Sequence, residues 1–165
     1  MLQNQCLKRW IEAIIMAKKL AIIYGTGFGN TGLMAKAIEE GARESGLDVL
    51  IKKVDEATVA DVENADAIAI GLATYKGAGM PSVIKYVESL AKVPLKNKVG
   101  TAFGSYGWSG EGPIAITKTL SSYGMDVIEP PLRIKRIPEE EGLEECRKLG
   151  KQIADKIEKR TSEEM

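Results

Sequence analysis

Short apolar runs alternate with segments of helical spacing along most of this chain of 165 residues. The first apolar run, Leu20 to Tyr24, ends at a glycine, and in the next segment, Asn30 to Ser45, apolar residues recur every three or four positions. The further extended segments span 48–54, 66–72, 98–104 and 125–137, and the further helical segments span 58–64, 81–92, 113–123 and 138–160. This alternation predicts a three-layer α/β fold, in which helices cover both faces of a doubly wound, five-stranded parallel sheet.

The polarity of the extended segments indicates where each strand lies in the predicted sheet. Segment 66–72 is largely apolar and is expected to be buried, whereas segment 48–54 is partly polar and is expected at an edge. Segment 125–137 is broken by Pro130 and Pro131. No linker or internal repeat interrupts the alternation, so we expect one domain over 18–160, followed by a polar, frayed tail at 161–165.

Residues 1–17 precede the predicted domain and form an N-terminal extension. A signal peptide is not expected, because Glu12 interrupts the apolar region and no small-residue cleavage site follows. The segment is either an extra helix that docks on the domain or on a partner, or the product of an upstream start codon, with Met16 as the natural start. In the helical interpretation, one face carries Leu7, Trp10, Ile11, Ile14 and Ile15.

Composition excludes several classes of function. The chain has no histidine, which removes Ser-His triads, histidine-liganded metals and imidazole acid–base chemistry. Its two cysteines, Cys6 and Cys146, are far apart and form no Cys-x-x-Cys pattern, so we expect no zinc site or disulfide and a cytoplasmic protein. The chain has 23 Lys plus Arg residues and 23 Asp plus Glu residues, so its formal net charge is zero. No nucleic-acid partner is expected, because binding of nucleic acid needs a broad positive field. No apolar run approaches the ~18 residues of a membrane span.

The loop after the first predicted strand has the composition of a phosphate-binding turn. In sheets of this kind, ligands bind beyond the carboxyl ends of the strands. Residues 25–32 supply glycines that allow backbone amides to converge, together with side-chain donors at Thr26, Asn30 and Thr31. The helix that follows adds the positive end of its dipole. A phosphomonoester can be held here by neutral donors alone.

Aromatic residues gather in the loops after the third and fourth predicted strands. Only 5% of the chain is aromatic, yet Tyr75, Tyr106 and Trp108 all lie in these loops, where flat faces can stack on a planar ring. The first loop also contains Gly-x-Gly-x-x-Gly at 27–32, and Asp55 follows at the distance of a ribose-binding acid. A dinucleotide-binding domain therefore remains an alternative at this point.

The sequence resembles the flavodoxin family at these loops. Residues 24–31 (YGTGFGNT) are similar to the family's phosphate loop, Thr/Ser-x-Thr-Gly-x-Thr, with Thr26 at the first hydroxyl position. Phe28 departs from the pattern, because a second hydroxyl is usual there. Residues 102–110 (AFGSYGWSG) are similar, almost letter for letter, to the third flavin loop of the flavodoxin-like domain of flavodiiron (A-type) flavoproteins, and residues 79–82 (GMPS) to the end of their second loop.

The resemblance implies a flavodoxin-like fold with strand order 2-1-3-4-5 and flavin mononucleotide (FMN) as the cofactor. The phosphate of FMN would lie at residues 26–31, and loops 73–79 and 105–110 would wrap its ring. The predicted cofactor contacts are Thr26, Gly27, Phe28, Gly29, Asn30, Thr31, Ala73, Thr74, Tyr75, Lys76, Gly77, Gly79, Ser105, Tyr106, Gly107, Trp108 and Gly110.

We expect an electron carrier rather than an enzyme that transforms a substrate. The loops offer no evident acid or base, since the nearest carboxylate, Glu111, is expected to act as a helix N-terminal charge. The carrier would pass electrons to a separate redox partner, such as a ferredoxin, a diiron protein or a reductase. The alternatives are an NAD(P)H-dependent quinone or nitro reductase of the same fold and an NAD-binding Rossmann domain. Flavodiiron proteins also need a metal domain that is rich in histidine, and this chain has no histidine. Reduction of oxygen or nitric oxide by this chain alone is therefore not expected.

Overall fold

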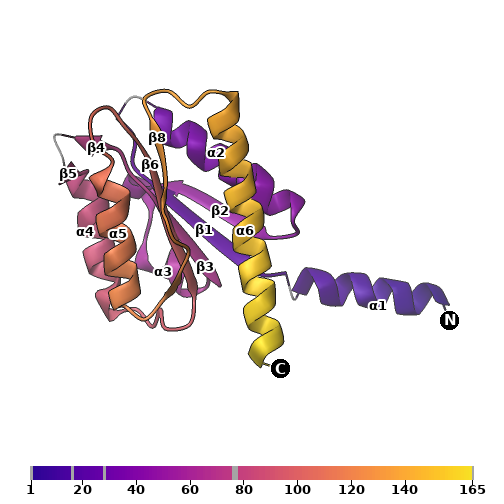
Figure 1. The fold of residues 1–165 in the computed structure, drawn as a ribbon. Coiled ribbons are helices and arrows are strands. Elements are labelled where there is room, and N and C mark those ends of the chain that lie inside the picture. Colours follow the sequence, from indigo (N-terminus) through magenta and orange to yellow (C-terminus); the bar gives the residue numbers. More distant parts are fainter. Residues whose placement is uncertain (1, 16, 28, 76–77, 165) are drawn as a thin grey trace.

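A parallel sheet forms the centre of the domain in the computed structural model, which describes residues 2–15, 17–27, 29–75 and 78–164. Its central strands are β1 (Lys19–Tyr24), β2 (Asp48–Lys53), β3 (Ala67–Gly71) and β6 (Val99–Tyr106). They lie in the order β2-β1-β3-β6, and two short strands, β7 (Asp126–Val127) and β8 (Leu132–Lys135), pair in parallel with β6 (Figure 1). The predicted order 2-1-3-4-5 is confirmed, because β7 and β8 together form the fifth strand.

Helices cover both faces of this sheet. Helices α2 (Asn30–Glu44) and α6 (Glu140–Glu164) lie on one face. Helices α3 (Val59–Glu63), α4 (Pro81–Ser89) and α5 (Glu111–Ser122) lie on the other. The smaller elements are the 3₁₀ turns η1 (Val54–Glu56) and η2 (Leu90–Lys92), the strands β4 (Thr74–Tyr75) and β5 (Ala78–Gly79), and the N-terminal helix α1 (Leu2–Ile15).

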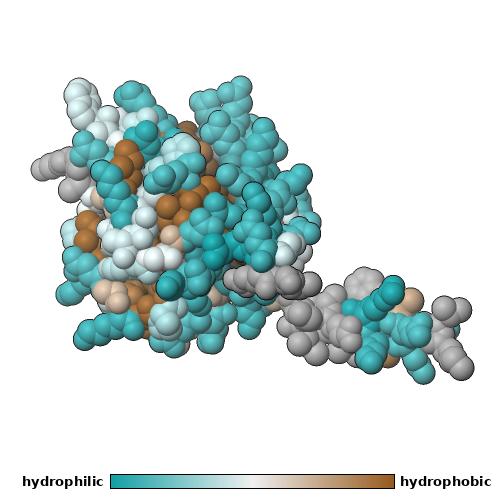
Figure 2. Space-filling view, turned by 60° about the horizontal axis from the view of Figure 1, so that its bottom comes forward, coloured by the Kyte–Doolittle hydropathy of each residue, from teal (hydrophilic) through white to brown (hydrophobic). Residues whose placement is uncertain are grey.

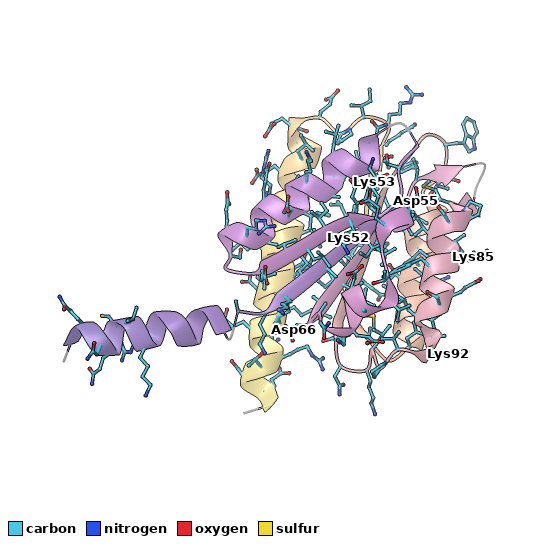
Figure 3. All side chains as sticks on the ribbon, turned by 180° about the vertical axis from the view of Figure 1, so that it is seen from behind. Lys52, Lys53, Asp55, Asp66, Lys85 and Lys92 are labelled. Carbon is cyan, nitrogen blue, oxygen red and sulfur yellow. The ribbon has the colours of Figure 1, made fainter. Side chains whose placement is uncertain are left out.

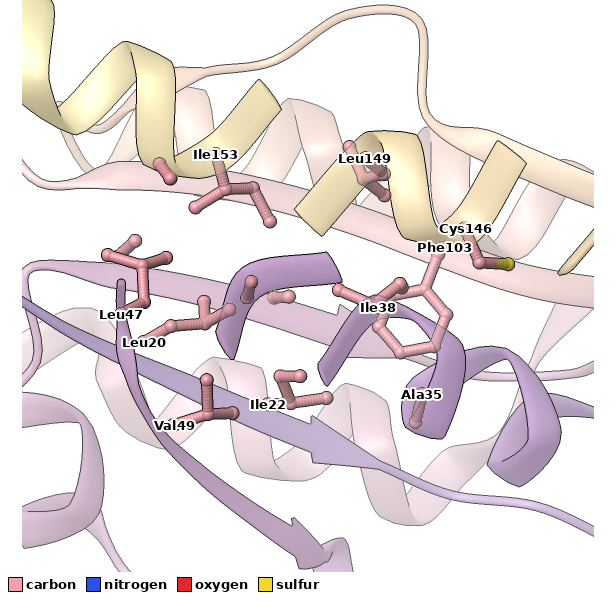
Figure 4. Close-up of a cluster of buried hydrophobic side chains, with 14 of the residues drawn as sticks. Leu20, Ile22, Ala35, Ile38, Leu47, Val49, Phe103, Cys146, Leu149 and Ile153 are labelled. Atoms are coloured by element: carbon pink, nitrogen blue, oxygen red, sulfur yellow. The ribbon is translucent and has the colours of Figure 1, made fainter. Parts of the chain in front are cut away.

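The core consists of two apolar clusters, one on each side of the sheet. Successive residues of a strand point to opposite faces, so Leu20 and Ile22 of β1 pack under α2 and α6, while Ala21 and Ile23 pack under α3, α4 and α5. The first cluster also contains Ile38, Phe103 and Ile153 (Figure 4). This packing fixes the carboxyl ends of the strands relative to the first turns of the helices that follow them.

Helix α1 extends away from the domain (Figures 1 and 2). Residues 3–9 are exposed, and Leu7 of the predicted apolar face is 60% exposed. The side chains of the other four residues of that face, at 10, 11, 14 and 15, lie outside what the structure describes, so their docking stays a prediction. Figure 2 shows a domain surface that is largely hydrophilic in that view, with small apolar patches. No helix in the described ranges is long and apolar enough to cross a membrane.

Several predicted boundaries are wrong by a few residues. Strand β6 continues to Tyr106, two residues past the predicted end, because β8 pairs with it from Phe103 onward. Helix α5 begins at Glu111 rather than at residue 113, and α6 runs from residue 140 to 164 rather than from 138 to 160. The frayed tail predicted at 161–165 is helical through residue 164. Arg160, near that end, contacts Asp126 of β7 at 2.7 Å.

Candidate functional site

A cavity of about 480 Å³ opens at the carboxyl edge of the sheet, where the sequence predicts a ligand. Four segments contribute to it: the loops that follow β1, β3 and β8, and the end of β6 with its loop. The lining residues are Thr26, Gly27, Asn30, Ala73, Thr74, Ser105, Tyr106, Gly107, Trp108, Ser109 and Arg136. The volume lies within the range of roughly 300–1,000 Å³ that is typical of small-molecule sites.

The loop between β1 and α2 brings the first turn of α2 to this cavity. Gly29, the N-cap residue, has a φ of +89°, a conformation that favours glycine, and no side chain caps the helix there. Thr26 Oγ1 accepts a hydrogen bond of 2.9 Å from the Gly29 N–H, which tightens the turn. The first-turn amides of α2 have no partner within the helix. Together with Thr26 and Asn30 in the lining, they form a neutral site suited to an anion.

A buried contact joins this loop to the end of β6. Thr31 of α2 and Ser105 of β6 are both buried, and their Oγ atoms lie 3.4 Å apart. Ser105 also lines the cavity. The contact therefore fixes the start of α2 relative to the strand from which the aromatic loop extends.

The end of β6 and its loop bring two aromatic side chains to the cavity. Tyr106 is the last residue of β6 and is half-buried, and Trp108 is 94% exposed. Both line the cavity, with Gly107 between them. An indole and a phenol ring in this arrangement can stack on a planar ligand, and the indole also remains accessible to solvent.

The loop after β3 forms a short hairpin that is tied to the start of α5. Strands β4 and β5 pair antiparallel, and Thr74 also pairs in parallel with Tyr106 of β6. Thr74 Oγ1 accepts a buried hydrogen bond of 3.0 Å from the Gly112 N–H. Ala73 and Thr74 line the cavity. The loop after β3 is thus held beside the loop after β6.

Eight of the predicted contacts stand apart from those that line the cavity. Gly29 is the N-cap residue of α2, Thr31 lies in the first turn of that helix, Gly79 lies in β5, and Gly110 is the N-cap residue of α5. These four are not among the lining residues, so their contact with a ligand stays a prediction. The predicted contacts of Phe28, Lys76, Gly77 and the Tyr75 side chain lie outside the described residues.

Two lining residues were not singled out from the sequence, Ser109 and Arg136. Ser109 follows Trp108 in the loop after β6. Arg136 follows β8 and has a φ of +62°, and its N–H donates a hydrogen bond of 2.7 Å to the Tyr106 carbonyl oxygen. Arg136 lies inside the predicted extended segment 125–137, so no signal in the sequence indicated that it follows the strand and reaches the cavity.

The charges at the site suit an anionic ligand rather than acid–base chemistry. Arg136 is the single charged side chain in the described lining, which includes no carboxylate. Asp55, which a dinucleotide site would use, lies in η1 after β2 and is absent from the lining (Figure 3).

Burial raises the pKa of the Tyr86 hydroxyl and of the Cys146 thiol to about 12, and neither group lines the cavity. The described residues include no cluster of His, Cys, Asp or Glu that could hold a metal ion.

Comparison with known proteins identifies the family. The sequence model of the flavodoxin family matches residues 22–150. Type A flavoprotein fprA of Rhodobacter capsulatus is 37% identical over 146 residues, which cover 85% of this chain and 33% of that protein. A flavodoxin from the domain Archaea is 36% identical, with a TM-score of 0.82 over 85% of this chain and 99% of that structure.

The flavodiiron relatives are longer than this chain, which spans about a third of the length of the curated relatives it matches. The rubredoxin:oxygen oxidoreductase of Desulfovibrio gigas superposes with a TM-score of 0.83 over 96% of this chain and 42% of that structure. Its identity is 24%, so this likeness concerns the fold alone. The predicted resemblance to flavodoxins and to type A flavoproteins is confirmed, and so is FMN, the cofactor of this family. The chain belongs to the flavodoxin family.

Proposed function

We propose that this chain holds one FMN and carries electrons to a separate redox protein. One observation carries the proposal: a single cavity combines a neutral loop at the start of α2 with the aromatic loop after β6. The first feature suits a phosphomonoester and the second a planar ring, which are the two ends of FMN. When bound, FMN would supply reversible electron transfer, and the protein would hold and orient it.

The residues of the cavity divide between the two ends of the cofactor. Thr26, Asn30 and the first-turn amides of α2 would hold the phosphate, because they are donors at the positive end of a helix dipole. Tyr106 and Trp108 would cover the ring. Ala73 and the hairpin after it would exclude water from the opposite side. The Thr74–Gly112 hydrogen bond would keep that hairpin in place, since it is buried.

The exposed side of the cavity supports transfer between proteins. Trp108 is 94% exposed and is therefore available to a docking partner while it covers the ring. The described lining has no carboxylate or thiol that could exchange protons with a substrate. A carrier needs neither a second substrate pocket nor such a group, whereas a quinone or nitro reductase needs a place for its substrate beside the flavin.

We propose a ferredoxin, a separate diiron protein or a reductase as the partner. One relative, 27% identical over 140 residues, is the rubredoxin-oxygen oxidoreductase of Megalodesulfovibrio gigas, whose name includes a second protein, rubredoxin. The archaeal flavodoxin is matched over 99% of its length, which supports this set of elements as sufficient for a carrier. Both cysteines are free in the described structure, which supports a reducing compartment such as the cytoplasm.

Steady-state assays on the FMN-loaded chain separate a carrier from a reductase. The loaded protein is mixed with NADH or NADPH and a quinone, and nicotinamide oxidation is followed. We expect no turnover above that of free FMN, whereas the chemically reduced chain should pass electrons to a one-electron acceptor protein. Sustained oxidation of NADH or NADPH with the quinone would support the reductase alternative. The apo chain is the matched control for contaminating reductases.

A further inference from the structure

Arg136 brings a positive charge to a cavity that is otherwise neutral in the described residues. No salt bridge in the described part of the chain includes Arg136, although Glu139 and Glu141 line a neighbouring pocket with it. Arg43, Arg147 and Arg160 pair with carboxylates, whereas Arg9 and Arg133 resemble Arg136 in having no salt bridge among the described residues. The guanidinium of Arg136 is therefore available to an anion that enters the cavity.

The backbone holds Arg136 at this place in an unfavourable conformation. Its φ of +62° lies in the left-handed region, which an arginine rarely adopts. The N–H of Arg136 donates a hydrogen bond of 2.7 Å to the Tyr106 carbonyl, and the preceding residue, Lys135, pairs with Tyr106 in the sheet. Asn97, the other described non-glycine residue with positive φ, is of a type that tolerates this region. Such conformations persist where the surrounding structure imposes them, and they gather at functional sites.

The fold brings Arg136 into the same cavity as the loop at the start of α2. Helices α2 and α6 pack on the same face of the sheet, and the connection from β8 to α6 crosses the end of the molecule at which α2 begins (Figure 1). Arg136 opens that connection, and it lines the same cavity as Thr26 and Asn30 of the phosphate loop. Arg136 thus shares a cavity with the residues at the positive end of the α2 dipole.

We propose that Arg136 is a specificity residue that pairs with the phosphate of the flavin and makes the site prefer FMN to riboflavin. The inference rests on the proposed function, because it presumes that the cavity holds FMN. Neutral donors hold a phosphate by hydrogen bonds, whereas a guanidinium adds charge attraction and can present two parallel donors to its oxygens. Arg136 is exposed, so water and salt weaken this attraction.

Binding titrations with two flavins test the proposal. Apo protein is titrated into FMN or riboflavin, and flavin fluorescence is followed for the wild type, Arg136→Gln, Arg136→Lys and Lys135→Gln. Glutamine and lysine are unbranched at Cβ, as arginine is, and keep similar backbone strain. Lys135→Gln removes one positive charge from the neighbouring residue, which is exposed and outside the cavity lining.

We expect Arg136→Gln to weaken FMN binding roughly 5- to 50-fold at low salt, as for a partly screened, charge-assisted contact. Riboflavin binding should change less than twofold, and the loss for FMN should shrink as salt is raised. Arg136→Lys should keep most of the FMN affinity, and Lys135→Gln should change it less than twofold.

Three results would overturn the proposal. Arg136→Gln could leave FMN affinity unchanged, could weaken riboflavin as much as FMN, or could match the effect of Lys135→Gln. The second result would mean that Arg136 serves packing, and the third that only the general field matters. A wild-type chain that binds neither flavin would refute the proposed function itself and the inference with it.

Discussion

Thr101 carries a hydroxyl group that is buried in the core. Its side chain lies in β6, next to Ala69 of β3 in the sheet, and is 1% exposed. The Oγ1 atom of Thr101 has no hydrogen-bond partner among the described residues. Because valine has nearly the same shape as threonine, Thr101→Val replaces this hydroxyl by a methyl group without leaving a cavity. We therefore expect the substitution to stabilise the folded chain.

The magnitude follows from the burial of that hydroxyl. A buried hydroxyl without a partner costs about 1–3 kcal/mol in protein mutational data. We take the lower end of this range as the expected gain. Thr101→Val should then raise the free energy of unfolding by about 1 kcal/mol, which corresponds to about 2–4 °C in Tm for a chain of this size.

Thr117→Val is the matched control, measured alongside by urea unfolding followed with circular dichroism. Thr117 is also buried, but its hydroxyl donates a hydrogen bond of 2.8 Å to the Pro113 carbonyl oxygen. The same change there should lower the free energy of unfolding by about 0.5–1.5 kcal/mol. The two substitutions should thus act with opposite sign. Destabilisation by Thr101→Val, or the same sign at both positions, would refute the reasoning.

Three further predictions concern packing, thiol reactivity and pH. A Cβ on Gly41 would lie 2.0 Å from the Arg147 carbonyl oxygen, so Gly41→Ala should push α2 from α6 and lower the free energy of unfolding by about 1–3 kcal/mol; an unchanged urea midpoint would contradict this. Burial raises the pKa of Cys146 to about 12, so at pH 8 a thiol reagent should modify only the exposed Cys6 until the chain unfolds. Two reactive thiols in the native state would contradict this prediction. Burial, with a smaller effect of a nearby carboxylate, raises the pKa of Tyr86 to about 12, above its ordinary value of 10.0. The stabilisation that the protonated Tyr86 contributes is therefore fully present below pH 10 and is lost as the pH rises toward 12. The Tyr86→Phe variant should lose less stability than the wild type over that interval, and parallel losses in the two proteins would show the reasoning to be wrong.

The sequence was sufficient where local patterns determine structure. The apolar run of β1 and the helical spacing of α2 are short-range signals, and the loop between them carries its own glycines and hydroxyls. Thr26, Asn30, Tyr106 and Trp108 could be placed together because the carboxyl ends of parallel strands meet at one edge. Family resemblance in two of those loops supplied the identity of the cofactor.

The features that the sequence did not reveal depend on contacts between distant segments. Arg136 joins the cavity only because β8 pairs with β6 and its N–H reaches the Tyr106 carbonyl. The polar residues after Arg160 suggested fraying, yet Arg160 lies against Asp126 of β7 and the helix continues past it. Composition and periodicity describe single elements, so they do not report such pairings.

A stepwise redox titration of the purified chain with FMN, followed by visible absorption, tests the central claim most directly. We expect one FMN bound per chain, with flavin bands that bleach in two separate one-electron steps. The cavity that combines the phosphate loop with the aromatic loop is the structural reason for the expected binding of FMN. A chain that shows no flavin absorption after FMN is added, and whose Tm does not rise with FMN, would contradict the account.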